Sequence, residues 1–191
     1  MSVEGYLIEH CAPTLASLKT ASLFSCPCRG QEDLQKELAE CSRRLCPKGV
    51  ELVLLRRCER SALVYVYRKG RLARELSARP VAAFLRQLGY CDLSEEGAIA
   101  CLAGRLAARG GFPHEIGLFL GYPLCDVQGF IRHAGRHCKC CGYWKVYGDE
   151  AEAQSLFQKF DRCREAYRRM FRRGCSLEQL TVAAGARQHG L

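Results

Sequence analysis

The sequence predicts a single domain of the α/β or α+β class, in which helices surround a small mixed sheet of about four strands. Segments rich in β-branched and aromatic residues are interspersed with segments whose apolar residues recur every three or four positions. The hydrophobic fraction of 48% suffices for a packed core and excludes a disordered chain. No internal repeat or linker divides residues 1–191, so the predicted domain covers them all, with 149–191 as a helical segment packed on it.

The first part of the chain predicts a helix, a strand, a second helix and a hairpin. Residues 3–10 predict a short helix, and 22–26 a short strand. In residues 31–45 the apolar positions have helical spacing. The segments 50–58 and 61–68 have strand composition, and the short polar turn between them predicts a hairpin.

Helices dominate the rest of the chain. Pro80 is expected in the first turn of one helix, and Ser94 caps the next. Residues 112–131, FPHEIGLFLGYPLCDVQGFI, predict two short helices around a tight turn. Bulky residues alternate in 142–148 and predict a further strand, after which Asp149 caps a long helix.

The pair of short helices has the apolar packing positions of a DNA-reading helix-turn-helix. These positions are Ile116, Gly117, Leu120, Gly121, Val127 and Phe130. The outer face of the second helix offers only Gln128 and Arg132 for reading bases, and Asp126 near its start is expected to repel phosphate. A helix-turn-helix regulator is therefore the alternative function rather than the leading one.

The chain is basic, with a net charge of +9 from 29 Lys and Arg against 20 Asp and Glu. This charge predicts weak, salt-sensitive nucleic-acid binding without sequence preference. The expected contact surface is the arginine-rich side of the last helix, formed by Arg162, Arg164, Arg168, Arg169, Arg172 and Arg173. Neither a signal peptide nor a membrane-spanning apolar run is recognisable, so we expect a cytoplasmic protein that does not contact a membrane.

Fourteen cysteines in such a chain indicate buried thiols, metal ligands or redox chemistry rather than disulfides. Cys41, Cys101 and Cys163 lie on the apolar stripes of predicted helices, so we expect them to be core residues. Cys26 and Cys28 form a CxC pair that could bind a soft metal or undergo redox chemistry.

Three long segments carry a resemblance to a known family. HCAPTLASLKTASLFSC (10–26), the segment 112–131 and GYWKVYGDEAEAQSLFQKF (142–160) resemble motifs of the bacterial domain of unknown function 3793. The resemblance extends from about Tyr6 to about Leu180. It implies a role in iron or redox physiology, with flavodoxin or ferrous-iron uptake proteins as associated partners.

His10 and Cys11 belong to the first of these motifs. An imidazole beside a thiol can lower the pKa of the thiol, which would make Cys11 a nucleophile or a metal ligand. Adjacent residues of a helix point in different directions, however, so the alternative is a helix-terminal histidine beside a buried cysteine.

His114 and Glu115 follow Pro113 at a predicted helix start. His114 could act as an acid, a base or a ligand oriented by Glu115, or Glu115 could simply favour the helix dipole. Lys145 and Tyr147 alternate with other residues on a predicted strand and would share one face. That face could bind an anionic group or be solvated.

Five further candidate ligands lie close together in HAGRHCKCCGYW: His133, His137, Cys138, Cys140 and Cys141. Such a set could hold zinc, copper(I) or an iron–sulfur centre. Gly135 is expected to end the helix between the two histidines, however, and the spacing matches no standard zinc finger.

The leading hypothesis is a pocket that binds a small anionic ligand, a metal such as zinc or iron, or an iron-containing cofactor. Its candidate lining is His10, Cys11, Cys26, His114, Glu115, Lys145 and Tyr147. A shared site requires His10 and Cys11 to lie close to His114 and Glu115, about 100 positions away in sequence. The alternatives are a nucleic-acid binder and a thiol-dependent enzyme that uses Cys11.

Overall fold

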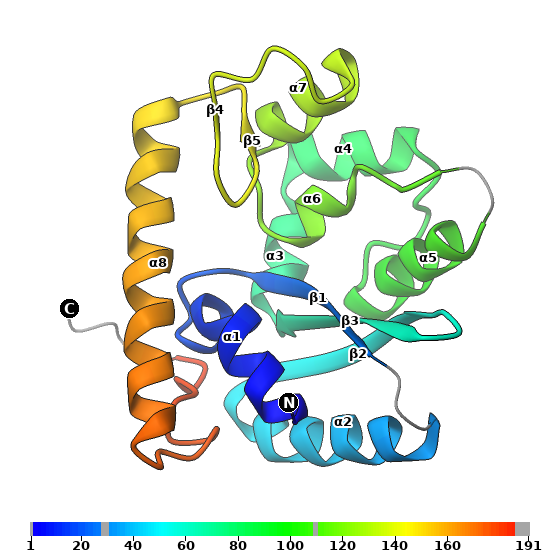
Figure 1. Cartoon of the computed structure of the whole chain (residues 1–191). Coiled ribbons are helices and arrows are strands. Elements are labelled where there is room, and N and C mark those ends of the chain that lie inside the picture. The colour runs from blue at the N-terminus through cyan, green and yellow to red at the C-terminus, as the bar shows by residue number, and fades with distance from the viewer. Residues whose placement is uncertain (1, 28–30, 109–110, 186–191) are drawn as a thin grey trace. The chain divides into compact units, whose positions relative to one another are not determined.

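The structure is a computed structural model that describes residues 2–27, 31–108 and 111–185. It confirms the α+β class: these residues form eight α-helices, a three-stranded antiparallel sheet and a separate two-stranded sheet (Figure 1). The chain divides into two compact units, Met1–Lys69 with Cys163–Leu191, and Gly70–Arg162. Each unit is described by itself below, and a single domain with 149–191 packed on it stays a prediction.

The first unit is built on the three-stranded sheet. Its elements are α1 (Val3–Leu15), β1 (Ala21–Pro27), α2 (Gln31–Leu45), the 3₁₀ helix η1 (Cys46–Lys48), β2 (Val50–Arg57) and β3 (Ser61–Arg68). The strands are antiparallel in the order β1-β3-β2, which confirms the predicted hairpin. The sheet is not mixed, because every strand pair in it is antiparallel.

Helix α1 is longer than the predicted 3–10. It continues through Pro13 to Leu15, and residues 11–15 are all buried. Burial of this last turn therefore outweighs the hydrogen bond that proline removes from a helix. The core of this unit lies between the sheet, α1, α2 and the second half of α8 (Glu150–Arg172), with Leu7, Leu45, Val64 and Tyr167 among its members.

Arg68, at the end of β3, is a buried cation that joins three segments of the first unit. Its guanidinium donates hydrogen bonds to the carbonyl oxygens of Thr14 (2.7 Å) and Leu15 at the end of α1. It also donates to the carbonyl oxygens of Lys48 (3.3 Å) and Val182 (2.6 Å). Carbonyls at the end of a helix carry partial negative charge, so they compensate the buried positive charge.

The second unit is mostly helical. It contains α3 (Arg71–Ser77), α4 (Arg79–Gln87), α5 (Glu95–Ala107), α6 (Ile116–Phe119), α7 (Leu124–His133), the hairpin β4 (Cys140–Cys141) and β5 (Lys145–Val146), and the first half of α8. The predicted caps are confirmed: Ser94 Oγ accepts from the Gly97 N–H (3.1 Å), and Asp149 Oδ1 accepts from the Glu152 N–H (2.9 Å).

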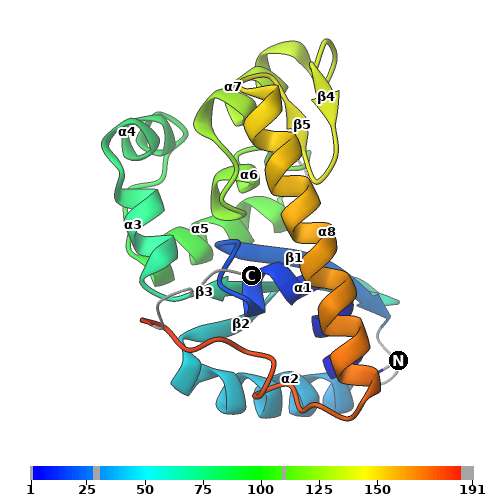
Figure 2. The same ribbon diagram turned by 90° about the vertical axis from the view of Figure 1, so that its left-hand side faces the viewer.

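The predicted strand 142–148 is much shorter than expected. Only Lys145–Val146 is a strand, and it pairs with Cys140–Cys141 in a small hairpin rather than with the three-stranded sheet (Figure 2). The physical reason is that the N–H groups of Tyr147 and Gly148 donate to the Asp126 carboxylate instead of to a neighbouring strand.

Candidate functional site

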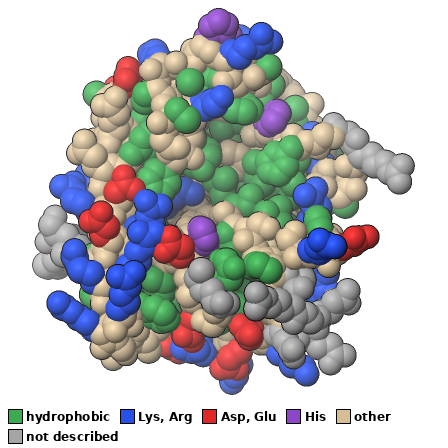
Figure 3. Space-filling view, in the orientation of Figure 1, with side chains coloured by type: hydrophobic (Ala, Val, Ile, Leu, Met, Phe, Trp, Pro, Cys, Tyr) green, Lys and Arg blue, Asp and Glu red, His purple; other side chains and the backbone are tan. Residues whose placement is uncertain are grey.

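A cavity of about 250 Å³ lies in the second unit, between the segment that leads into α6, helices α6 and α7, and the β4–β5 hairpin. It is lined by Phe112, His114, Ile116, Gly117, Tyr122, Asp126, Val127, Phe130, Cys141, Gly142, Trp144 and Lys145. In the space-filling view, hydrophobic side chains gather over this part of the second unit (Figure 3). The cavity therefore has a mainly apolar wall with a few polar groups, as small-molecule sites do.

Aromatic rings form much of this wall. The Trp144 ring stacks on that of Tyr122, with centroids 4.7 Å apart and planes 26° from parallel. Phe157, from the first half of α8, lies nearly perpendicular to the Trp144 ring, with centroids 4.6 Å apart and planes at 82°. Phe130 adds a further ring from α7, and Phe112 is 48% exposed. The rings hold one another in stacked and edge-to-face geometries, which fixes the shape of the wall.

Asp126 anchors the hairpin to α7. Its carboxylate is only 3% exposed and accepts three hydrogen bonds of 2.7 Å, from Trp144 Nε1 and from the N–H groups of Tyr147 and Gly148. Asp126 is therefore not presented to solvent on α7, where the expected repulsion of phosphate would need it. Its partners lie 18 to 22 positions away, so no local sequence signal reveals this role.

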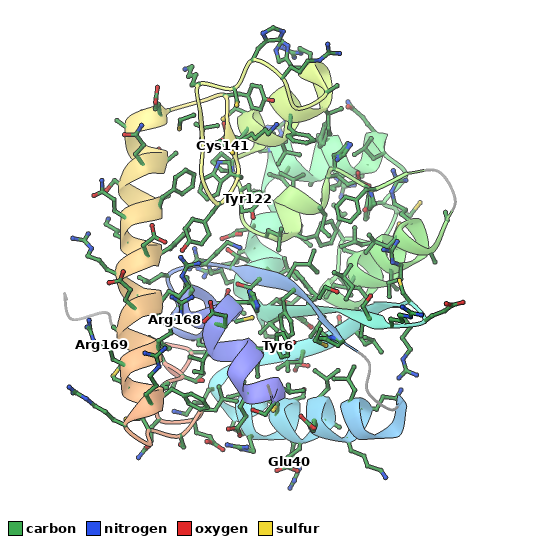
Figure 4. All side chains as sticks on the ribbon, viewed as in Figure 1. Tyr6, Glu40, Tyr122, Cys141, Arg168 and Arg169 are labelled. Atoms are coloured by element: carbon green, nitrogen blue, oxygen red, sulfur yellow. The ribbon has the colours of Figure 1, made fainter. Side chains whose placement is uncertain are left out.

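The cavity brings together three residues that the sequence singled out in separate motifs. His114 is exposed, and its ring lies 4.9 Å from that of Phe130 and 6.4 Å from that of Phe112. Lys145 Nζ lies 5.9 Å from the centre of the same Phe130 ring and donates to the Gly135 carbonyl (2.7 Å). Cys141 is the cross-strand partner of Lys145, and Figure 4 labels it together with Tyr122.

Glu115 neither lines this cavity nor orients His114. It is 4% exposed and accepts hydrogen bonds from Arg105 Nε (2.6 Å) and the Tyr90 hydroxyl (3.1 Å). Its side chain makes no capping hydrogen bond at the start of α6. Burial and the neighbouring carboxylate raise the pKa of Tyr90, so the phenol stays a hydrogen-bond donor. Glu115 thus ties α6 to α5 and to the segment that follows α4.

His10 and Cys11, in the first unit, point in different directions as adjacent helical residues do. Cys11 is fully buried in the core, and burial raises the pKa of its thiol to about 12. His10 is exposed and stacks on Tyr6 (5.9 Å) and Phe24 (5.7 Å). A neutral buried thiol is a poor nucleophile and a poor metal ligand. His114 and Glu115 belong to the second unit. A site that they would share with His10 and Cys11 therefore stays a prediction.

Cysteines on the predicted apolar stripes are buried or partly buried. Cys41 is buried and Cys163 half-buried, and burial raises the pKa of their thiols to about 11 and about 12. Cys101 is half-buried. Cys26 is also buried, with its Sγ 3.9 Å from the Ala62 carbonyl oxygen, whereas Cys28 lies outside the described residues.

The cluster between α7 and the hairpin does not converge on one point. Ala134 and Gly135 have positive φ and end α7, which confirms the predicted break between His133 and His137. His133 stacks on Tyr147 (5.7 Å), and the Tyr147 hydroxyl donates to the Arg136 carbonyl, so Tyr147 does not line the cavity with Lys145. No three His, Cys, Asp or Glu side chains are arranged to hold a metal ion anywhere in the described ranges.

The short helices α6 and α7 and the last helix α8 bear on the expected binding of DNA. Helix α6 has a single turn, and on α7 the exposed positions include Cys125, Ile131 and Arg132, with Gln128 half-buried. On α8, Arg168 forms an ion pair with Glu9, so the positive charge of the arginine-rich side is partly neutralised.

In the parts of the chain that the structure describes, no helix combines the length and the apolarity needed to cross a bilayer.

Comparison with known proteins gives one match to a family. A family model described as "Protein of unknown function (DUF3793)" matches residues 7–181 of the 191. The match includes all three motifs on which the sequence resemblance depends. Neither a curated protein nor a solved structure matches the chain.

Proposed function

The chain belongs to the family described as protein of unknown function (DUF3793), and we propose that it binds a small molecule with a flat, largely apolar body in the cavity of the second unit. The observation that carries this proposal is the aromatic wall. Phe112, Tyr122, Phe130 and Trp144 surround a space of about 250 Å³. This space is slightly smaller than that of a typical ligand pocket, so it suits a molecule of one or two rings.

The wall is held in place before any ligand binds. Trp144 is fixed by the Asp126 carboxylate and by the rings of Tyr122 and Phe157. The Tyr122 hydroxyl in turn donates to the Tyr143 carbonyl (3.2 Å). A site whose side chains are already ordered spends little free energy on ordering them when a ligand binds, which favours affinity.

The other functions considered from the sequence have less support. A thiol-dependent enzyme that uses Cys11 would need a reachable thiolate, and Cys11 is fully buried with a raised pKa. A metal-binding function would need ligands that converge, and the described residues contain no such group. Among the features considered, the cavity therefore gives the best support for a proposed function.

Trp144 provides the test, because it is the only tryptophan of the chain and lines the cavity. We expect a single indole N–H signal in the ¹H–¹⁵N correlation spectrum of the full-length protein. Titration with benzyl alcohol and with 2-naphthol, two neutral flat probes, should shift this signal saturably. The absence of any saturable shift at millimolar probe would refute the proposal.

Two exposed apolar residues offer a matched pair of variants. Phe112 lines the cavity and is 48% exposed, whereas Ile131 is 41% exposed and does not line it. Phe112→Ala removes one ring contact and should weaken probe binding by about threefold or more. Ile131→Ala should leave binding unchanged, and equal weakening by both variants would contradict binding in this cavity.

A further inference from the structure

We propose that the ligand of this cavity is an aromatic acid whose acidic group is bound by Lys145 and His114. This inference rests on the proposed function. The two side chains approach the same ring of the wall: the His114 ring lies 4.9 Å and Lys145 Nζ 5.9 Å from the centre of Phe130. A ligand ring that packs within the wall therefore lies in a cavity whose lining includes two basic side chains, each close to the Phe130 ring.

The other polar groups of the wall are already committed. Trp144 Nε1 donates to Asp126, and the Tyr122 hydroxyl donates to the Tyr143 carbonyl. Asp126 is the one carboxylate among the lining residues, and its oxygens accept three hydrogen bonds of 2.7 Å. Its negative charge is thus compensated by donors within the protein and is not directed at a ligand.

Lys145 keeps capacity for a ligand. Its ammonium has three N–H donors, and besides its approach to the Phe130 ring it makes one hydrogen bond among the described residues, of 2.7 Å to the Gly135 carbonyl. This bond holds the side chain in place while two donors remain. His114 has only ring contacts with Phe112 and Phe130 among the described residues, so its nitrogens are also available.

The thiol of Cys141, which lines the same cavity, is compatible with an anionic ligand. Cys141 lies opposite Lys145 in the hairpin, and a thiol is a weak donor that neither neutralises the ammonium nor repels an anion. Hydrogen bonds from an ammonium to a carboxylate are stronger than neutral ones, and an apolar wall strengthens them further. An aromatic acid can contact both the aromatic rings and the basic side chains of the lining, whereas a neutral aromatic ring makes favourable contacts with the aromatic rings alone.

The test compares three probes of similar size on the full-length protein: benzoate, phenyl phosphate and neutral benzamide. Affinity is measured from the Trp144 indole signal at fixed ionic strength. At least one of the two acids should bind about tenfold more tightly than benzamide. The two acids separate a carboxylate ligand from a phosphate ligand, and preference for either one supports the inference.

Matched variants locate the preference. Lys145→Met should abolish the advantage of the acid over benzamide, and His114→Gln should reduce it. Lys139 and His133 serve as controls, because Lys139 also donates to one backbone carbonyl and His133 is also an exposed histidine, yet neither lines the cavity. Lys139→Met and His133→Gln should therefore leave the preference intact, and unchanged amide spectra establish that each variant is folded.

The outcomes distinguish this inference from the proposed function. If benzamide binds as tightly as both acids, the acidic ligand is refuted and the apolar binding site stands. If Lys139→Met reduces the preference as much as Lys145→Met does, the preference reflects net charge and the inference is also refuted. If none of the probes, charged or neutral, shifts the indole signal, the proposed function itself fails.

Discussion

The buried carboxylate of Asp126 accepts a 2.7 Å hydrogen bond from the indole nitrogen of Trp144, and this contact joins helix α7 to the β4–β5 hairpin. The same carboxylate binds the next two backbone N–H groups after the hairpin. One acid thereby determines both the position of an aromatic wall residue and the course of the chain into α8. The cavity depends on this contact more than on any regular strand pairing.

Replacing Asp126 with Asn should destabilise the protein and disturb the cavity. The amide has one acceptor oxygen, so its NH₂ group would face N–H donors that now meet a carboxylate. We expect a loss of about 2–4 kcal/mol in the free energy of unfolding. Urea denaturation measures this loss, and a red shift of the Trp144 fluorescence in the folded variant would show that the indole has become more exposed.

Asp149→Asn is the matched control for this prediction. Asp149 caps α8 from an exposed position through one hydrogen bond to the Glu152 N–H, and Asn is an equally good N-cap residue. Its substitution should change the free energy of unfolding by less than about 0.5 kcal/mol. Similar losses in the two variants would contradict a special role for the buried carboxylate.

Much of the fold follows from local sequence signals. The structure confirms the predicted helix caps at Ser94 and Asp149 and the predicted hairpin of 50–58 and 61–68. These features were predictable because each depends on residues that are close together in the chain. The course of 142–148 was not predictable in the same way, since Asp126 takes the N–H groups that a longer strand would need. Likewise, α1 continues through Pro13 because its last turn is buried.

In the candidate site, too, the individual residues were predictable from the sequence and their long-range packing was not. His114, Cys141 and Lys145 were recognised as chemically capable residues, but their common cavity depends on how α7 and the hairpin pack. The aromatic wall is not evident from the sequence, because Phe130 occupies an apolar packing position of the predicted helix pair and Tyr122 falls between its two helices. The signal that could have found it is the concentration of aromatic residues in the second and third family motifs.

The ion pair of Arg44 and Glu178 in the first unit predicts a specific pH dependence of stability. The hydrogen bonds from Arg44 lower the pKa of Glu178 from 4.5 to about 2. Because the folded state holds the carboxylate ionised, this contribution is fully present above about pH 4.5 and is lost as the pH falls towards 2. Glu178→Gln should therefore cost stability at pH 6 and cost less at pH 3, as measured by urea denaturation at both pH values.

Glu40→Gln is the control for this pH effect. Glu40 pairs with Arg43 on the exposed side of α2, and exposed pairs of this kind contribute little to stability. Its substitution should have almost no effect at pH 6. A cost for Glu178→Gln that is independent of pH would show that packing, rather than ionisation, explains the effect of the substitution.

The second half of α8 should mediate the weak nucleic-acid binding that the net charge predicts. Arg169 and Arg172 in α8 and Arg173 directly after it are exposed, whereas Arg168 is paired with Glu9. Each phosphate contact contributes about 0.9 to the slope of log K against log salt. Replacing the three exposed arginines with Ala should therefore lower the slope by up to about 3, measured by fluorescence anisotropy with random-sequence DNA.

A charge-matched control separates this surface from net charge alone. Alanine at three exposed arginines outside α8 removes the same charge: Arg57, Arg60 and Arg86. This variant should retain most of the salt dependence. Equal losses in both variants would assign the binding to net charge, and a sequence-selective complex that persists at physiological salt would instead favour the regulator hypothesis.

The reactivity of the cysteines offers a test of burial and of the cavity in a single experiment. Cys11, Cys26 and Cys41 are buried, whereas Cys125 and Cys141 are exposed. Brief alkylation with iodoacetamide under reducing conditions, followed by peptide mass spectrometry, should label Cys125 and Cys141 and leave Cys11, Cys26 and Cys41 unmodified until denaturant is added. Rapid labelling of Cys11 in the folded protein would restore the thiol-dependent enzyme as a hypothesis.

Of the exposed thiols Cys125 and Cys141, a ligand should protect only Cys141. Cys141 lines the cavity and lies opposite Lys145, whereas Cys125 is exposed on α7 and does not line the cavity. Saturating benzoate should therefore slow the alkylation of Cys141 severalfold and leave the rate at Cys125 unchanged, since occupancy blocks access only at the wall that the ligand contacts. Lys145→Met should remove this protection by benzoate, because the acid no longer binds tightly there. Equal slowing at both thiols would indicate a general effect of the salt and would contradict occupancy of the cavity.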